Sequence, residues 1–249
     1  MLSYITSRKT VGSLAAYDDD FDLQKYYEFL SMSKDVKEKA GAGSKAFPGT
    51  LLKPTKETNL PPEVLELLVQ YYRNTYDELL FVTLSNIHNS PSGSIVVFPK
   101  VNQFGRLRIG AEVIGSTFSA RHIKSANILS RFVLDDDTIV TYPGQVQFFF
   151  EHTIHIPSEG SIKHYLAFVK WYDRTGDRRS QFHCQIDKNN LNICNVELWR
   201  KDFHELKRDC IIPIHNILGR FVAGQMEIGK KHHSKKYLAV IPINRKIHI

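Results

Sequence analysis

Cysteine is scarce in this chain of 249 residues, where only Cys184, Cys194 and Cys210 occur. Three cysteines do not form a disulfide framework, which is a device of much smaller secreted domains. We therefore expect free thiols in a reducing compartment. The gaps between these cysteines hold no CxxC pair, so the sequence predicts no zinc site of the usual spacing.

Long apolar runs are also missing. No stretch reaches the roughly 18 apolar residues of a membrane span. The N-terminal MLSYITSRKT is followed by the acidic run Asp18–Asp20 and not by the apolar core of a signal peptide. We expect a soluble protein that is not secreted and has no membrane partner.

Motifs of the common catalytic sites are absent as well. The GAGSK stretch from Gly41 to Lys45 lacks the GxxxxGK[ST] spacing of a phosphate-binding loop, and no GxSxG nucleophile elbow occurs. The carboxylates of Asp135–Asp137 are consecutive and so diverge, which favours a solvated turn over a metal site. His152 and His155 fall on opposite faces of one expected strand, as structural or surface histidines. We predict no catalytic residue, no cofactor, no metal and no small-molecule substrate.

The composition allows a full hydrophobic core, because 42% of the residues are hydrophobic. Lys and Arg number 33 against 26 Asp and Glu, a formal charge of +7 that favours anionic partners. Most of these cations are scattered. Two small clusters stand out: Lys230, Lys231, Lys235 and Lys236, and the pair Arg178 and Arg179.

The first part of the chain differs from the rest. We interpret residues 1–57 as a flexible or partly helical segment, because SMSKDVKEKAGAGSKAFPGT is charged and without period. A helix is predicted over 61–76, where prolines precede apolar residues at helical spacing. It opens a β-rich domain over 58–249.

From Leu79 onward, short runs of Val, Ile, Phe and Tyr alternate with turn clusters. QVQFFFEHTIHI, from Gln145 to Ile156, alternates as a strand with one buried face. HYLAFVKWYD, from His164 to Asp173, is apolar on both faces, as in a doubly covered strand. IVVFP, RLRIGAEVIG, NILSRFVL and YLAVIPI supply further strands. The predicted fold class is mainly β with N-terminal helices (α+β).

Three motifs over residues 139–226 resemble a bromo-adjacent homology (BAH) domain. They are YPGQVQFFF at Tyr142–Phe150, VKWYDR at Val169–Arg174, and VELWRKDFHELKRDCIIPIHNILGRFV at Val196–Val222. The resemblance implies a partly open β-barrel core, a place in chromatin and thus a nuclear location. TGDRRSQFH, from Thr175 to His183, replaces the family's usual acidic and aromatic patch.

The wider chain also resembles the C-terminal part of uncharacterised proteins associated with fungal transposable elements. LPPEVLELLVQYYRNTY, FGRLRIGAEVIGS, YPGQVQFFF and IIPIHNILGRFV carry this likeness. It implies a remnant of a mobile element without its catalytic portion.

Two functions follow. In the first, the chain is a non-catalytic module that binds a chromatin protein or histone tail, with Tyr142, Tyr172 and Trp199 as contacts, since rim aromatics stack on peptides or cage methylated lysine. In the alternative, it is a DNA-binding accessory protein or transposase remnant. Its phosphate contacts would then be Arg106, Arg108, Arg178, Arg179, Lys230, Lys231, Lys235 and Lys236.

Overall fold

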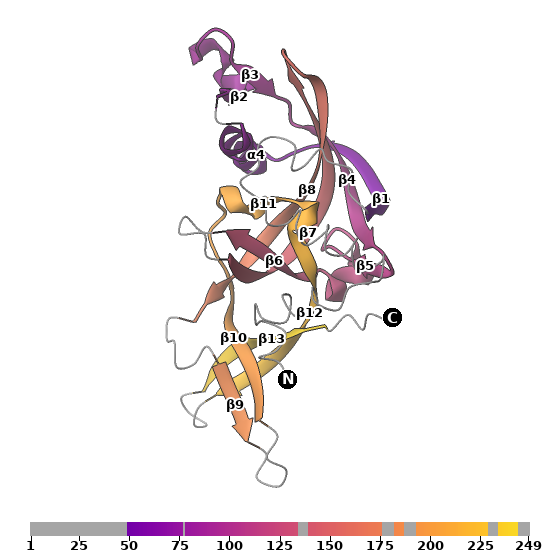
Figure 1. Ribbon diagram of the computed structural model, residues 1–249, viewed down its shortest axis with the longest axis vertical. Coiled ribbons are helices and arrows are strands. Elements are labelled where there is room, and N and C mark those ends of the chain that lie inside the picture. Colours follow the sequence, from indigo (N-terminus) through magenta and orange to yellow (C-terminus); the bar gives the residue numbers. More distant parts are fainter. Residues whose placement is uncertain are drawn as a thin grey trace, which may run out of the picture. The chain divides into compact units, whose positions relative to one another are not determined.

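The computed structural model describes residues 49–76, 78–133, 139–175, 182–186, 193–228 and 234–243. Over these residues the chain is mainly β, as the sequence predicts, with one α-helix and four short 3-10 helices (Figure 1). The helical elements are α4 (Pro62–Thr75), η2 (Leu84–Asn89), η3 (Ala120–Ser125), η4 (Arg208–Cys210) and η5 (Ile214–Asn216). The strands are β1 (Gly49–Asn59), β2 (Phe81–Thr83), β3 (Ile95–Val97), β4 (Lys100–Ile109), β5 (Glu112–Ile114), β6 (Asn127–Val133), β7 (Ile139–Ile156), β8 (Gly160–Arg174), β9 (Phe182–Ile186), β10 (Ile193–Phe203), β11 (Ile211–Pro213), β12 (Ile217–Ile228) and β13 (Lys235–Pro242).

Helix α4 confirms the helix predicted over 61–76. Pro62 is its first residue, where the missing N–H has no helical acceptor to lose. The apolar spacing then turns one face inward, and this face buries Val64, Leu67, Leu68, Val69, Tyr71 and Tyr72.

Strand β1 corrects the predicted flexible or partly helical segment over 1–57, because residues 49–57 are extended and pair with β4. The pairing register shifts between Leu52 and Thr55, at Lys53 and Pro54. This irregularity hides the strand alternation in the sequence. The remainder of the segment lies outside the described residues.

The two long strand predictions are confirmed. Strand β7 contains QVQFFFEHTIHI, and β8 contains HYLAFVKWYD with its central residues buried on both faces. The register of β7 against β8 shifts between Val146 and Phe148. This shift accompanies the burial of both Phe149 and Phe150, which simple alternation would place on opposite faces. The acidic run Asp135–Asp137 lies outside the described residues.

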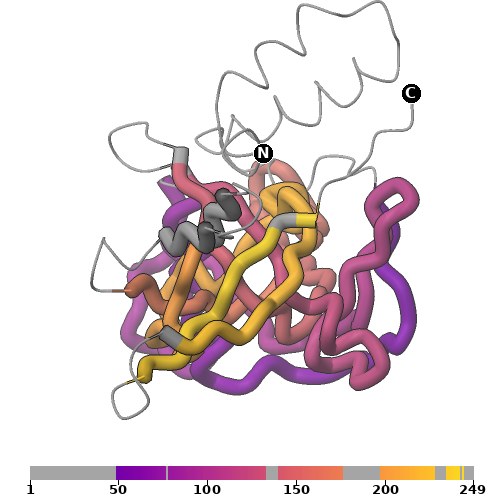
Figure 2. Tube along the Cα trace, turned by 90° about the horizontal axis from the view of Figure 1, so that it is seen from below, coloured from indigo at the N-terminus to yellow at the C-terminus, as the bar shows by residue number. Residues whose placement is uncertain are grey.

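The chain divides into two compact units. Among the described residues, the larger unit holds those within Val36–Trp171 and His204–Arg220, and the smaller unit those within Tyr172–Phe203 and Phe221–Ile249. In the larger unit β1, β4, β7 and β6 pair in that order, β8 pairs β7 and β11, and all these pairs are antiparallel. In the smaller unit β12, from Phe221 onward, pairs antiparallel with β13, as Figure 2 traces in yellow, and β13 also pairs β10.

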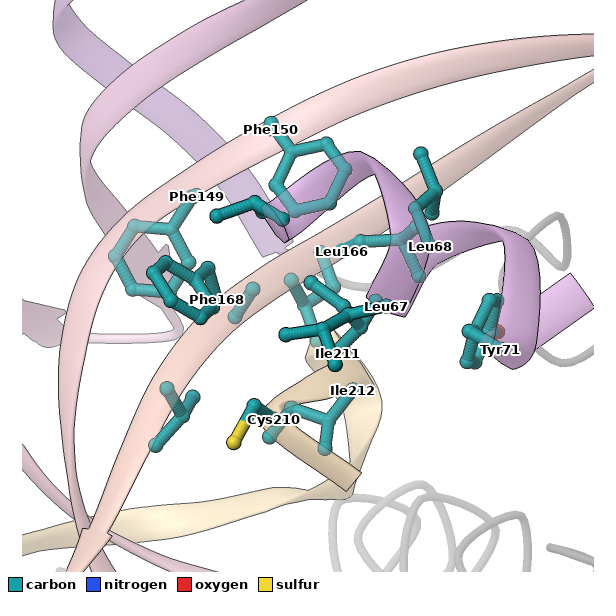
Figure 3. Close-up of a cluster of buried hydrophobic side chains, with 14 of the residues drawn as sticks. Leu67, Leu68, Tyr71, Phe149, Phe150, Leu166, Phe168, Cys210, Ile211 and Ile212 are labelled. Atoms are coloured by element: carbon teal, nitrogen blue, oxygen red, sulfur yellow. The ribbon is translucent and has the colours of Figure 1, made fainter. Parts of the chain in front are cut away.

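The main core belongs to the larger unit. Side chains of α4, β7, β8 and β11 meet in it, among them Leu67, Phe149, Leu166 and Ile211 (Figure 3). None of these four is more than 6% exposed. The core therefore fixes α4 against the β7–β8 hairpin.

Candidate functional site

The three predicted contact aromatics are mostly buried. Trp199 is 1% and Tyr172 is 6% exposed. The Tyr172 ring lies 4.7 Å from that of Phe203, and burial raises the pKa of its hydroxyl to about 12. Burial removes Tyr172 and Trp199 from the predicted surface contacts. Tyr142 stays half-buried, with its ring edge-on to Phe132 at 5.7 Å.

The predicted phosphate contacts are distributed over both units. Arg106 and Arg108 lie on β4 in the larger unit, and Lys235 and Lys236 are exposed on β13 in the smaller unit. Arg178, Arg179, Lys230 and Lys231 lie outside the described residues.

Arg106 and Arg108 are two residues apart on β4 and so share the outer face of this strand. The Nε–H group of Arg106 donates to the carbonyl oxygen of Lys53 at 2.7 Å, which fixes the guanidinium. Arg108 is exposed and pairs with Val113 of β5 across the strands. One arginine is thus held in place while the other projects into solvent.

The fold adds two cations, Arg121 and Lys124, and the imidazole of His122 to this pair from η3. Nη1 of Arg106 lies 3.5 Å from Nε2 of His122, which brings η3 beside β4. Arg121 and Lys124 flank His122 and are exposed. We call Arg106, Arg108, Arg121, His122 and Lys124 the basic cluster.

The carboxylates of β1 and β5, which both pair with β4, are engaged by other cations. Glu57 of β1 receives the ammonium of Lys100 at 2.8 Å, and Glu112 of β5 receives Nε of Arg220 at 2.7 Å. No carboxylate of the described residues forms an ion pair with a member of the basic cluster. Within the described residues the cations of the cluster are thus not neutralised by ion pairs, which favours contacts with phosphate oxygens.

A second group of polar side chains is buried in the larger unit. His152 of β7 and His164 of β8 are cross-strand partners and are 1% and 0% exposed. Nε2 of His152 lies 2.9 Å from the carbonyl oxygen of Phe98, so this nitrogen carries the proton and donates it. Nδ1 accepts from the hydroxyl of Tyr72 at 2.8 Å. The hydroxyl of Tyr76 lies 3.0 Å from Nε2 of His164.

Both imidazoles are neutral at ordinary pH. Burial lowers the pKa of His152 to about 4. Burial, and secondarily the nearby His152, lower that of His164 to about 4. Burial raises the pKa of Tyr72, and raises that of Tyr76 to about 12. The group joins α4 to the β7–β8 hairpin, and for His152 it confirms the structural interpretation of the sequence.

Removing the Tyr72 hydroxyl is expected to weaken this connection. In Tyr72→Phe, Nδ1 of His152 loses its donor inside the core, at a cost of about 1–3 kcal/mol in the free energy of unfolding. Urea denaturation at neutral pH measures it. Tyr165→Phe is the matched control, since this half-buried ring on β8 has no hydrogen-bonded hydroxyl among the described residues. Equal stability of the two variants would contradict the prediction.

The described part of the chain offers few other groups that could form a chemical site. It holds no group of three or more His, Cys, Asp or Glu placed to bind a metal ion. It also contains no helix long and apolar enough to span a membrane. Cys210 is a free, buried thiol whose pKa is raised to about 11, chiefly by burial.

The sequence indicated only some members of the basic cluster and of the buried histidine–tyrosine group. His152 interrupts an apolar strand face, which is the signal of a buried histidine, but Tyr72 and Tyr76 read as ordinary apolar positions of a helix. Arg121, His122 and Lys124 lie close together in SARHIKS, and local charge density alone could have found them. Their approach to Arg106 depends on the tertiary structure.

No protein-family model, no curated protein and no solved structure matches this chain.

Proposed function

We propose that this chain is a non-catalytic nuclear module that binds nucleic acid in chromatin through the phosphate backbone. The chromatin setting rests on the BAH-like motifs over 139–226, whose family has a partly open β-barrel core. The likeness to proteins associated with transposable elements adds the proposal that the module descends from a mobile element.

One observation carries the nucleic-acid proposal: the basic cluster joins two separate segments, β4 and η3, with no carboxylate partner among the described residues. Positive charge that is neutralised by neighbouring acids gives little attraction for phosphates, whereas uncompensated charge releases counterions when it binds DNA. Arg108, Arg121 and Lys124 are exposed and supply this attraction. Arg106 and His122 contact each other and hold β4 beside η3.

Binding of a chromatin peptide through Tyr142 is the second candidate. Of the three predicted contact aromatics, only Tyr142 is not buried. An aromatic contact responds weakly to salt, whereas phosphate contacts respond steeply. Salt dependence therefore separates the two candidates.

Neutralising the exposed cluster is expected to weaken binding to duplex DNA. For Arg108→Gln/Arg121→Gln/Lys124→Gln, the plot of log affinity against log salt should be less steep by about 2–3, because each phosphate contact contributes about 0.9 to the slope. The loss should be similar for two unrelated duplex sequences, since phosphate contacts carry no sequence information. Fluorescence anisotropy over a range of salt concentrations measures both quantities.

The matched control is Lys163→Gln/Lys207→Gln/Arg208→Gln. It removes three exposed cations of the same unit, one on β8, one just before η4 and one at the start of η4. This control should keep the wild-type slope. Both variants should unfold at the wild-type urea concentration, since exposed charges each change stability by about 0.5 kcal/mol or less. Wild-type protein that binds no duplex at low salt would overturn the proposal.

A further inference from the structure

We propose that Ile123 is an apolar wedge that enters the minor groove of duplex DNA and partly separates two base pairs while the basic cluster holds the phosphates. This inference rests on the proposed function and specifies its ligand, an intact duplex that is bent on binding. Ile123 is 46% exposed at the centre of η3. It is the one large apolar side chain among the exposed residues of that helix.

The backbone of η3 holds Ile123 outward. The N–H of His122 donates to the carbonyl oxygen of Ser119 at 2.8 Å, and the N–H of Ala126 donates to the carbonyl oxygen of Ile123 at 3.1 Å. Ser119 and Ala126, on either side of the helix, are 7% and 0% exposed. Both ends of η3 are therefore fixed in the protein, and its middle projects.

Gly115, the residue that follows strand β5, braces η3. The N–H of Gly115 donates to the carbonyl oxygen of Ser125 at 3.0 Å. The hydroxyl of Ser125 in turn donates to the carbonyl oxygen of His122 at 2.8 Å. A Cβ atom at Gly115 would collide with the carbonyl oxygen of His122, so only glycine permits this approach. A braced turn loses little conformational entropy when its side chain enters a ligand.

The residues around Ile123 indicate which kind of ligand its exposed side chain would contact. Single exposed isoleucines are common on protein surfaces and need no explanation. Here, however, Arg121 precedes and Lys124 follows Ile123, and Arg106 lies against the same helix through His122. Minor-groove proteins combine basic side chains with an apolar wedge that partly unstacks a base step. An apolar side chain between cations offers both parts.

The test compares an intact duplex with the same duplex carrying one single-base bulge. Unstacking costs a few kcal/mol, and a bulge has already lost this stacking, so the full-length protein should bind the bulged duplex about tenfold more tightly. Ile123→Ala should lose this preference, and Ile123→Leu should retain it. Energy transfer between dyes at the two duplex ends should report a bend that Ile123→Ala does not produce.

Leu84→Ala is the matched control, because Leu84 is 57% exposed on η2 of the same unit. It should keep the preference for the bulge. Equal affinity for both duplexes, unchanged in Ile123→Ala, would overturn the wedge and leave the proposed function standing. Absence of binding to either duplex would instead overturn the proposed function. Ile123-dependent binding to vesicles of phosphatidylserine and phosphatidylcholine, without duplex binding, would show that the cluster recognises a lipid surface and would overturn both proposals.

Discussion

The free energy of unfolding is expected to fall by about 3–4 kcal/mol between pH 7 and pH 5 through His152 and His164 alone. Their pKa values are about 4 in the folded chain, whereas histidine in an unfolded chain titrates near 6.5. Between these values the unfolded state binds more protons than the folded state. Stability from the neutral pair is therefore complete above about pH 6.5 and is lost progressively as the pH falls toward 4.

The surroundings of the pair explain why protonation is so unfavourable. Tyr72 and Tyr76 contact the imidazoles, and their raised pKa values keep both hydroxyls neutral. Among the described residues, the carbonyl oxygen of Phe98 is the acceptor that favours a protonated His152. The first proton also disfavours the second, because the rings are cross-strand partners.

Urea denaturation at several pH values, followed by tryptophan fluorescence and circular dichroism, measures this dependence. His152→Asn and His164→Gln should each be less stable than wild type at neutral pH, yet lose only about half as much stability between pH 7 and pH 5. The control His155→Asn removes an exposed histidine of the same strand and should keep the full dependence. The slope with pH decides the matter, because it does not depend on the absolute stability of a variant. An unchanged slope in both buried-site variants would contradict the assignment.

Secondary structure was largely predictable, because β7 and β8 carry their burial pattern in residue spacing alone. Prediction failed at β1, where Lys53 and Pro54 interrupt the alternation and only pairing with β4 makes the strand. A pattern of single residues does not contain a register shift, since the shift depends on the partner strand.

The candidate site was less predictable for a similar reason. Tyr172 lies near the end of β8 and Trp199 within β10. In the sequence, an aromatic residue of a strand is equally typical of a rim contact and of a packed ring. Arg106 and Arg108 could be predicted as phosphate contacts from the sequence of β4. Their association with η3 depends on tertiary contacts, which the sequence does not show. Charge that is uncompensated in space cannot be distinguished from charge that is merely scattered along a sequence.

Trp171 is expected to be the aromatic on which the larger unit depends most. It is 4% exposed, its ring stands edge-on to Phe132 at 5.0 Å, and its indole N–H donates to the carbonyl oxygen of Asp209 at 2.9 Å. Trp171→Ala removes the ring and leaves this partly buried hydrogen bond unmade. The free energy of unfolding should fall by about 3–5 kcal/mol, the usual range for a large aromatic in a core. Unchanged stability in urea denaturation, with loss of partner binding, would assign Trp171 to a binding site instead.

Gly144 tests whether the ring packs where the structure places it. A Cβ atom at this position would lie 2.5 Å from Cε3 of Trp171 and 2.6 Å from Cγ1 of Val169, which is too close without a shift of the ring or the strand. Gly144→Ala should therefore cost about 1–3 kcal/mol in the wild-type chain. In a Trp171→Leu background, where the ring atom is gone and Val169 remains, the same substitution should cost measurably less. The difference between the two costs is the coupling energy of a double-mutant cycle, expected to be about 0.5–2 kcal/mol. A coupling energy near zero would mean that the ring does not lie against Gly144, and that the cavity argument for Trp171→Ala must be abandoned with it.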